Sequence, residues 1–188
     1  MFGEPIAMDK LPEDSVVLRP HWAYMVRRTG ERRSRLCCDE SPRACPKLRA
    51  AVSTWSSCTE LPIQRLFLAI SASKDLRLYA ADVKDAYSHA PKPEIDTYLS
   101  IDSTYAEWYK GKHGRPIDQR LVLPINNRLQ GHPEAGKMWM RHIDKILVKE
   151  LGFQSTTHDR CIFRNPDRFG SEVYLLKQVD DILVSAID

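Results

Sequence analysis

The sequence has no long apolar run and no strong excess of one charge. None of its stretches approaches the roughly 18 consecutive apolar residues of a membrane span, and the opening MFGEPIAMDK lacks the apolar core of a secretory signal peptide. We therefore expect an intracellular protein, in the cytoplasm or the nucleus, with no membrane partner. The formal net charge of +3 over 188 residues does not by itself indicate a nucleic-acid-binding protein.

The sequence also lacks the cysteine spacing of a structural metal site. It contains five cysteines, but none of them form a C-x-x-C pair. Because nothing indicates secretion, we expect reduced thiols, mostly buried, and no disulfides. The apolar fraction of 43% excludes wholesale disorder, and the length suits one domain or a portion of a larger enzyme.

Basic residues are concentrated in one part of the chain. Eight lysines and arginines lie between Arg27 and Arg49, against three acidic residues. A local basic surface suits phosphate groups, although a solvated face explains these charges equally well. Residues 21–26 and 35–38 have strand character and flank a turn at residues 29–31, so we predict a basic hairpin.

Apolar spacing predicts the remaining elements. Apolar side chains recur at every third or fourth position in residues 60–72 and 133–151, which predicts two helices with one buried face each. Short apolar runs predict strands at residues 76–81, 97–101 and 119–123. Strands and helices are mixed along the chain, which favours an α+β fold.

Acidic residues stand at the ends of predicted strands. Asp180 and Asp181 separate the apolar runs 173–179 and 182–187, which predicts a hairpin with these two residues at its tip, and Asp82 follows the strand at 76–81. Aspartate is also ordinary turn chemistry. Converging carboxylates would repel one another without cations, and Mg²⁺ (or Mn²⁺) takes such ligands. Two such ions can promote phosphoryl transfer.

Three motifs resemble those of reverse transcriptases. The stretch Ala81-Asp82-Val83-Lys84-Asp85-Ala86-Tyr87 resembles their first catalytic motif, and Val179-Asp180-Asp181 resembles their V-D-D hairpin. Residues 129–139 (LQGHPEAGKMW) are similar to the L-x-G-x-x-x-A-P-R-x-W segment of Ty1/copia-type retrotransposons, with Gly136 at the place of the proline. Together with shorter matches at residues 33–36 and 151–163, the resemblance covers about residues 20–188.

The resemblance implies a fold and an activity. The expected fold is a split palm, an antiparallel sheet with helices on one face, plus a basic fingers hairpin. Residues 1–20 would form a leader, 21–75 a fingers-like region, and 76–188 a palm-like region that ends before the thumb. The implied function is that of a fragment of an RNA-directed DNA polymerase, which transfers deoxynucleotides to a primer 3′-hydroxyl on an RNA or DNA template. The thumb and RNase H parts of the polyprotein would lie outside this chain.

Roles of single residues follow from the same resemblance. Asp82, Asp180 and Asp181 match the catalytic carboxylates that hold two Mg²⁺ ions, joined by the main-chain carbonyl of Val83. Gln178, at the place of an aromatic residue, matches a primer contact. The remaining matches are nucleotide-binding positions: Arg33 and Arg35 for the triphosphate, Asp85, Ala86 and Tyr87 for the sugar pocket, and Gln130 and Gly131 beside the nascent base pair.

Other functions remain open from the sequence. Because the thumb is missing, we expect weak or no polymerase activity from this chain. The first alternative is an inactive or decayed fragment that only binds nucleic acid. The second is a different metal-dependent phosphotransferase, such as a nuclease, that uses the same three aspartates. The third is a plain structural or interaction domain.

Overall fold

A computed structural model describes residues 2–39, 41, 43–51, 54–127, 129–166 and 172–187. It forms two compact units, each built from two separate stretches of chain. The first unit contains Met1–Thr54 and Tyr87–Ala135, and the second contains Trp55–Ala86 and Gly136–Asp188. The predicted regions 21–75 and 76–188 were continuous, so the observed division differs from them. Apolar periodicity predicts local structure and does not show which distant segments pair. It therefore could not predict that each unit combines two separate stretches of the chain.

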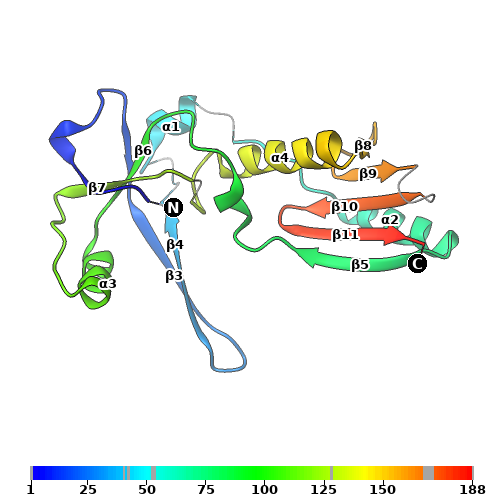
Figure 1. Cartoon of the computed structure of the whole chain (residues 1–188), viewed down its shortest axis with the longest axis horizontal. Coiled ribbons are helices and arrows are strands. Elements are labelled where there is room, and N and C mark those ends of the chain that lie inside the picture. Colours follow the sequence, from blue (N-terminus) through cyan, green and yellow to red (C-terminus); the bar gives the residue numbers. More distant parts are fainter. Residues whose placement is uncertain are drawn as a thin grey trace. The chain divides into compact units, whose positions relative to one another are not determined.

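The first unit contains a four-stranded sheet in the order β1-β7-β6-β2 (Figure 1). The strands are β1 (Ile6–Ala7), β2 (Val16–Leu18), β6 (Thr97–Ser100) and β7 (Leu121–Pro124). Strand β2 pairs with β6 in parallel, and the other pairs are antiparallel. Strands β6 and β7 confirm the predicted strands at 97–101 and 119–123. Leu99 of β6, Leu123 of β7 and Leu18 of β2 contribute to the core of the unit, together with buried side chains from the hairpin, the helices and the loops.

A long hairpin also belongs to the first unit. Strands β3 (Pro20–Val26) and β4 (Arg32–Cys38) pair antiparallel over seven residues each. The predicted hairpin is therefore confirmed and is longer than its apolar residues indicated. Exposed side chains dominate its outer half, where Tyr24 and Val26 are 69% and 67% exposed.

Short helices complete the first unit. These are the 3₁₀ turn η1 (Met8–Lys10), α1 (Pro46–Ala51) and α3 (Ser103–His113), and a second 3₁₀ turn, η2 (Ala86–His89), begins where the units meet in the sequence. Helix α3 was not predicted. It begins at Asp102, whose carboxylate accepts a hydrogen bond from the Tyr105 N–H at 2.7 Å, and ends at Gly114, which has a φ of +68°. These caps define a helix whose apolar periodicity is weak.

The second unit contains a five-stranded antiparallel sheet in the order β5-β11-β10-β9-β8. Its strands are β5 (Arg77–Asp82), β8 (Gln154–Ser155), β9 (Ile162–Asn165), β10 (Val173–Gln178) and β11 (Asp181–Ala186). Its helices are α2 (Leu61–Ser73) and α4 (Ala135–Lys145), and α4 continues into a π-helical turn over Ile146–Glu150. Both predicted helices are thus present, each close to its expected bounds.

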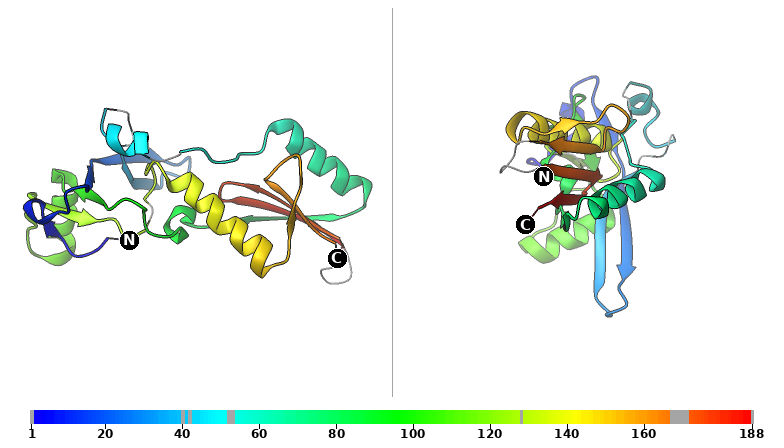
Figure 2. Two further views of the ribbon diagram at one scale, coloured as in Figure 1. Left: turned by 90° about the horizontal axis from the view of Figure 1, so that it is seen from above. Right: turned by 90° about the vertical axis from the view of Figure 1, so that its right-hand side faces the viewer.

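Helices α2 and α4 cover opposite faces of this sheet. Lys177 of β10 pairs with Asp144 of α4. The neighbouring side chain Gln178 points to the other face and accepts a hydrogen bond from the Thr59 N–H, just before α2, at 3.0 Å. Tyr174 shares the face of Gln178, and Lys74, at the end of α2, lies over its ring at 5.6 Å. Figure 2 shows the two helices on either side of the strands.

The prediction that helices cover only one face is therefore wrong for these two helices. Strand β10 carries the reason in its sequence. Its adjacent residues Leu175 and Leu176, which point to opposite faces, are 4% and 2% exposed. A strand with apolar side chains on both faces has to be covered on both faces.

No helix among the described residues is long and apolar enough to cross a membrane. The described residues also contain no disulfide. Cys38, Cys45 and Cys161 are buried as expected, whereas Cys58 is exposed. Burial raises the pKa of the Cys161 thiol above its usual value, so this group stays in the neutral form.

The buried ion pair between β10 and α4 gives a test of the two-sided sheet. The side chain of Lys177 is 4% exposed, so Asp144→Ala leaves a buried cation without its carboxylate and should lower the free energy of unfolding by about 3 kcal/mol. The double variant Asp144→Leu/Lys177→Met should recover most of this loss. Urea unfolding of both variants measures the difference. Equal losses in the single and double variants would show that the pair does not join β10 to α4.

Candidate active site

The pairing of β5 with β11 brings two aspartates together. Asp181 is the direct antiparallel partner of Asp82, and both side chains are exposed at the end of the sheet. Directly opposed residues share one face, with Cβ atoms about 4.5–5.5 Å apart. Gln178 of β10 is paired with Asp181 on its other side. The three residues therefore form a row across three adjacent strands on one face.

The third aspartate lies in the hairpin turn between β10 and β11. The pairing of Gln178 with Asp181 leaves Val179 and Asp180 as the two turn residues. The predicted tip, Asp180 with Asp181, is therefore wrong by one residue, because Asp181 already belongs to β11. Val179 has a φ of +58°, a left-handed conformation that costs a β-branched residue about 1–3 kcal/mol.

Two hydrogen bonds hold this strained turn. The indole Nε1–H of Trp139 in α4 donates to the carbonyl oxygen of Val179 at 2.7 Å. The N–H of Val83, the residue after β5, donates to the carbonyl oxygen of Asp180 at 2.9 Å. Trp139 lies in the helix predicted over residues 133–151 and is 3% exposed, so it belongs to the buried face of that helix. Its hydrogen bond to the turn was not predicted, since sequence spacing does not show it.

Gln178 is engaged within its own unit. Besides accepting from the Thr59 N–H, its amide Nε2 donates to the sulfur of Cys58 at 3.5 Å. Gln178 therefore joins the segment that leads into α2 to the strand that leads into the turn. The contact of Gln178 with a primer remains a prediction. In the structure, this side chain connects two segments of its own unit through hydrogen bonds.

The aspartates offer two facing carboxylates rather than a three-residue cluster. In the part of the chain that the structure describes, no three or more His, Cys, Asp or Glu residues are gathered closely enough to hold a metal ion. The predicted set of Asp82, Asp180 and Asp181 is thus not assembled here. Asp82 and Asp181 alone still suit Mg²⁺, which is commonly held by one or two carboxylates while waters and substrate phosphates complete its coordination.

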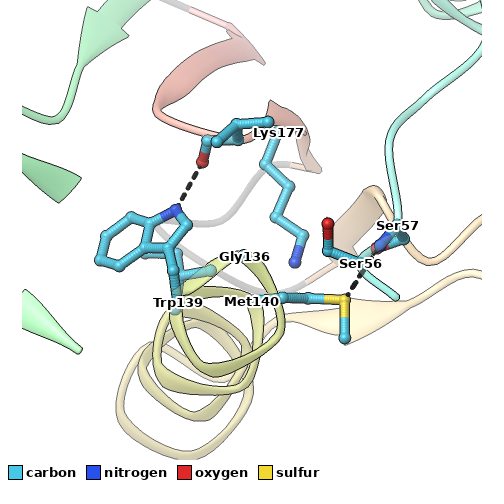
Figure 3. Close-up of a pocket in the computed structure, with 8 residues that line it drawn as sticks. Ser56, Ser57, Gly136, Trp139, Met140 and Lys177 are labelled. Carbon is cyan, nitrogen blue, oxygen red and sulfur yellow. Dashed lines mark hydrogen bonds between the residues drawn. The ribbon is translucent and has the colours of Figure 1, made fainter. Parts of the chain in front are cut away.

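A small cavity of about 20 Å³ lies beside the turn in the second unit (Figure 3). Its walls include Val179, Trp139 and the buried side chain of Lys177. The volume suits a single water molecule and is far too small for a nucleotide. A Cβ on Gly136, which also lines it, would lie 3.0 Å from the Ser56 Oγ. Gly136, where the resembling Ty1/copia-type segment has proline, is thus packed closely against Ser56.

The two arginines assigned to the triphosphate lie in the first unit, on one face of the β3–β4 hairpin. Arg33 is paired with Met25 and Arg35 with Ala23, so both side chains point to the same side of the ribbon. Arg35 is exposed, and the Nε of half-buried Arg33 lies 3.3 Å from Glu31. An exposed ion pair of this kind contributes little, so a phosphate could displace Glu31 at small cost.

The loop that contains Gln130 and Gly131 packs on the end of β4. The Cys38 N–H donates to the carbonyl oxygen of Gln130 at 2.8 Å. Gly131 has a φ of +81°, and a Cβ there would lie 2.4 Å from the carbonyl oxygen of Cys38. Glycine was expected at this position for a close approach to a base pair. The structure shows a close approach to the protein's own main chain instead, and the base-pair role remains a prediction.

A buried histidine near this loop was given no role from the sequence. His132 is 2% exposed, and its Nδ1 accepts a hydrogen bond from the Glu134 N–H at 3.3 Å. Its Nε2 lies 3.1 Å from the Thr97 hydroxyl oxygen, whose own proton is donated to the Ile95 carbonyl. The hydroxyl therefore accepts from Nε2–H, which fixes the tautomer. His132 thus fastens the loop to β6.

The sugar-pocket residues are divided between the units. Asp85, with a φ of +53°, and Ala86, which is 5% exposed, belong to the second unit. Tyr87 is half-buried and begins the second stretch of the first unit. Their roles around a nucleotide sugar remain predictions.

Comparison with known proteins gives one class of relative. No protein-family model matches the sequence, and no solved structure matches it. The chain is similar to a transposon polyprotein, and this similarity supports a retrotransposon origin. The relative is the retrovirus-related Pol polyprotein from transposon TNT 1-94 of Nicotiana tabacum, which is 25% identical over 124 residues. The match covers 66% of this chain but 9% of that polyprotein.

Gly131 can be tested against a glycine with the same backbone conformation. Gly30 also has a φ of +81°, but a Cβ there would meet nothing within 4 Å. Gly30→Ala should therefore cost only the left-handed strain, about 1 kcal/mol. Gly131→Ala should cost at least about 2 kcal/mol more, because main-chain atoms of Cys38 would have to move. Denaturant unfolding measures both, and equal losses would contradict the packing of this loop on β4.

The hydrogen bond from Trp139 to the turn can be removed while its ring is largely kept. Trp139→Phe should lower the free energy of unfolding by about 1–3 kcal/mol, because the Val179 carbonyl loses its donor and some packing is lost. Trp55→Phe is the matched control, since Trp55 is 59% exposed. Thermal unfolding should separate the two variants. A Trp139→Phe protein as stable as the control would show that the indole N–H does not hold the turn.

Proposed function

We propose that this chain is part of the catalytic core of an RNA-directed DNA polymerase from a copia-type retroelement. It would transfer deoxynucleotides from their triphosphates to a primer 3′-hydroxyl on an RNA or DNA template. The observation that carries the proposal is the pairing of Asp82 with Asp181 across two strands, next to a turn that presents Asp180. The similarity to a transposon Pol polyprotein supports it.

The paired aspartates explain why this site would take a cation. Two like charges directly opposite each other destabilise a sheet, and here they lie at the exposed end of β5 and β11. Asp82 and Asp181 would hold Mg²⁺, which supplies charge neutralisation to a bound triphosphate. Trp139 and Val83 position the turn through its two carbonyl groups. Asp180 is thereby held in the turn beside the aspartate pair.

Residues of the first unit would bind the nucleotide itself. Arg33 and Arg35 project from one face of the hairpin, and guanidinium groups are well shaped for bidentate pairing with phosphate oxygens. Tyr87 would contact the sugar and exclude a ribose 2′-hydroxyl, as the resemblance implies.

A second candidate is a fragment that binds nucleic acid without catalysis. The absence of a group of three metal-ligating side chains among the described residues favours it. It predicts binding that weakens steeply with salt and is unaffected by divalent ions. The first proposal predicts ion binding at the aspartate pair even where synthesis is slow.

Primer extension on an RNA template with Mg²⁺ tests the proposal, with Asp181→Asn as the variant. Asp75→Asn is the matched control, because Asp75 is exposed in the same unit just before the opposite end of β5. We expect extension to fall at least about 100-fold in Asp181→Asn, since a charge-stabilising group at the reacting phosphate is lost. The control should extend like the wild type.

Ion-dependent stability gives a second readout that does not need turnover. Without divalent ions, Asp181→Asn should unfold at a higher temperature than the wild type, because the repulsion with Asp82 is relieved. Mg²⁺ or Mn²⁺ should raise the unfolding temperature of the wild type and of Asp75→Asn, but not of Asp181→Asn. No extension together with no ion effect would overturn the polymerase proposal and leave the nucleic-acid-binding fragment.

A further inference from the structure

The C-terminal half of α3 exposes aromatic and basic side chains on the first unit. Trp108 is 47% exposed, and every residue from Lys110 to Pro116 is exposed. Between residues 107 and 115 the single acidic side chain is Glu107. We call the following residues the α3 surface: Trp108, Tyr109, Lys110, Lys112, His113 and Arg115.

The rings of this surface contact one another along the helix. Tyr109 and His113, one turn apart, stack with centroids 4.3 Å apart and an angle of 31° between their planes. Trp108 lies 5.3 Å from Tyr105, which is 8% exposed and belongs to the core. The exposed rings are therefore held against the core. They would lose little side-chain conformational entropy when a ligand binds.

Cationic groups lie against these rings. The Lys112 ammonium is 4.9 Å from the centre of the Trp108 ring. The Arg115 guanidinium lies 3.4 Å from the Tyr109 hydroxyl. An exposed cation–π contact contributes only about 0.5–1 kcal/mol, so a ligand can replace it.

A purely structural role explains only part of this surface. Lysine and histidine in the last turn stabilise a helix through its dipole, and this accounts for Lys110, Lys112 and His113. It does not account for a half-exposed tryptophan, since Tyr105, Ala106 and Tyr109 already supply the apolar contacts of α3 with the core. Aromatic rings interleaved with cations are typical of surfaces on which bases stack while phosphates are neutralised.

We propose that the α3 surface binds single-stranded nucleic acid. A base stacks on the indole of Trp108 and displaces the flexible Lys112 side chain from the ring. Lys112 and Arg115 then pair with the phosphates on either side of that base. A duplex is not the expected ligand, because its bases are already stacked on one another and offer no free face to the indole.

This surface is independent of the proposed polymerase site. It belongs to the first unit, whereas the paired aspartates belong to the second. It needs no divalent ion, so its test can be run in EDTA. A failure of the polymerase proposal therefore leaves this proposal standing, and the reverse also holds.

The test is binding of a fluorescent oligo(dT) to the full chain in EDTA, followed by anisotropy. Trp108→Ala should weaken binding about tenfold or more, because one base–aromatic stack is lost. The control is Trp55→Ala, which removes another exposed tryptophan. It should bind like the wild type.

The charge part of the surface is tested by Lys112→Gln against Lys10→Gln, which removes an exposed lysine elsewhere in the same unit. Lys112→Gln should reduce the slope of log affinity against log salt by about 0.7, the value for one phosphate contact on a single strand. Lys10→Gln should leave the slope unchanged. Unchanged binding by both Trp108→Ala and Lys112→Gln, or equal affinity of the wild type for duplex and single strand, would overturn the proposal.

Discussion

The candidate active site depends on the register of β5 against β11. This register places Asp181 opposite Asp82 on one face. A slip of one residue would move every side chain of β11 to the other face and separate the two carboxylates. The hydrogen bond from the Val83 N–H to the Asp180 carbonyl, just beyond the last strand pair, holds the register at the end where the acids lie. The alignment of the two carboxylates thus rests on main-chain contacts rather than on the acidic side chains themselves.

The same end of the sheet contains unfavourable terms that the rest of the unit must offset. Two carboxylates face each other, and Val179 has a left-handed backbone conformation. Such unfavourable features persist only where many surrounding contacts hold them in place. Here Trp139 fixes the turn from α4, and β10 is covered on both faces. The two facing carboxylates repel each other at an exposed sheet end, and the well-packed strand β10 holds that end in place. This arrangement is the one expected of a cation-binding site.

Local patterns predicted local structure well and long-range structure poorly. The hairpin of β3 with β4, helix α2 and strand β5 were found from periodicity and turn residues, because each depends on near neighbours in sequence. The predicted position of the β10–β11 turn was wrong by one residue. Two aspartates between apolar runs are compatible with turn residues 180–181 as well as with 179–180, so the sequence did not distinguish the two. Helix α3 was missed because its caps, Asp102 and Gly114, define it more than its apolar residues do.

The sequence indicated that Asp82 and Asp181 lie at strand ends, and the strand pairing places them opposite each other, whereas Asp180 lies in the turn. The hydrogen bond from Trp139 could not be predicted, because it reaches a carbonyl 40 positions away in sequence. The two units divide the predicted site residues between them. Asp82 and Asp181 belong to the second unit, and Arg33 and Arg35 belong to the first. Periodicity could not show this division, because it depends on which distant segments of the chain pair.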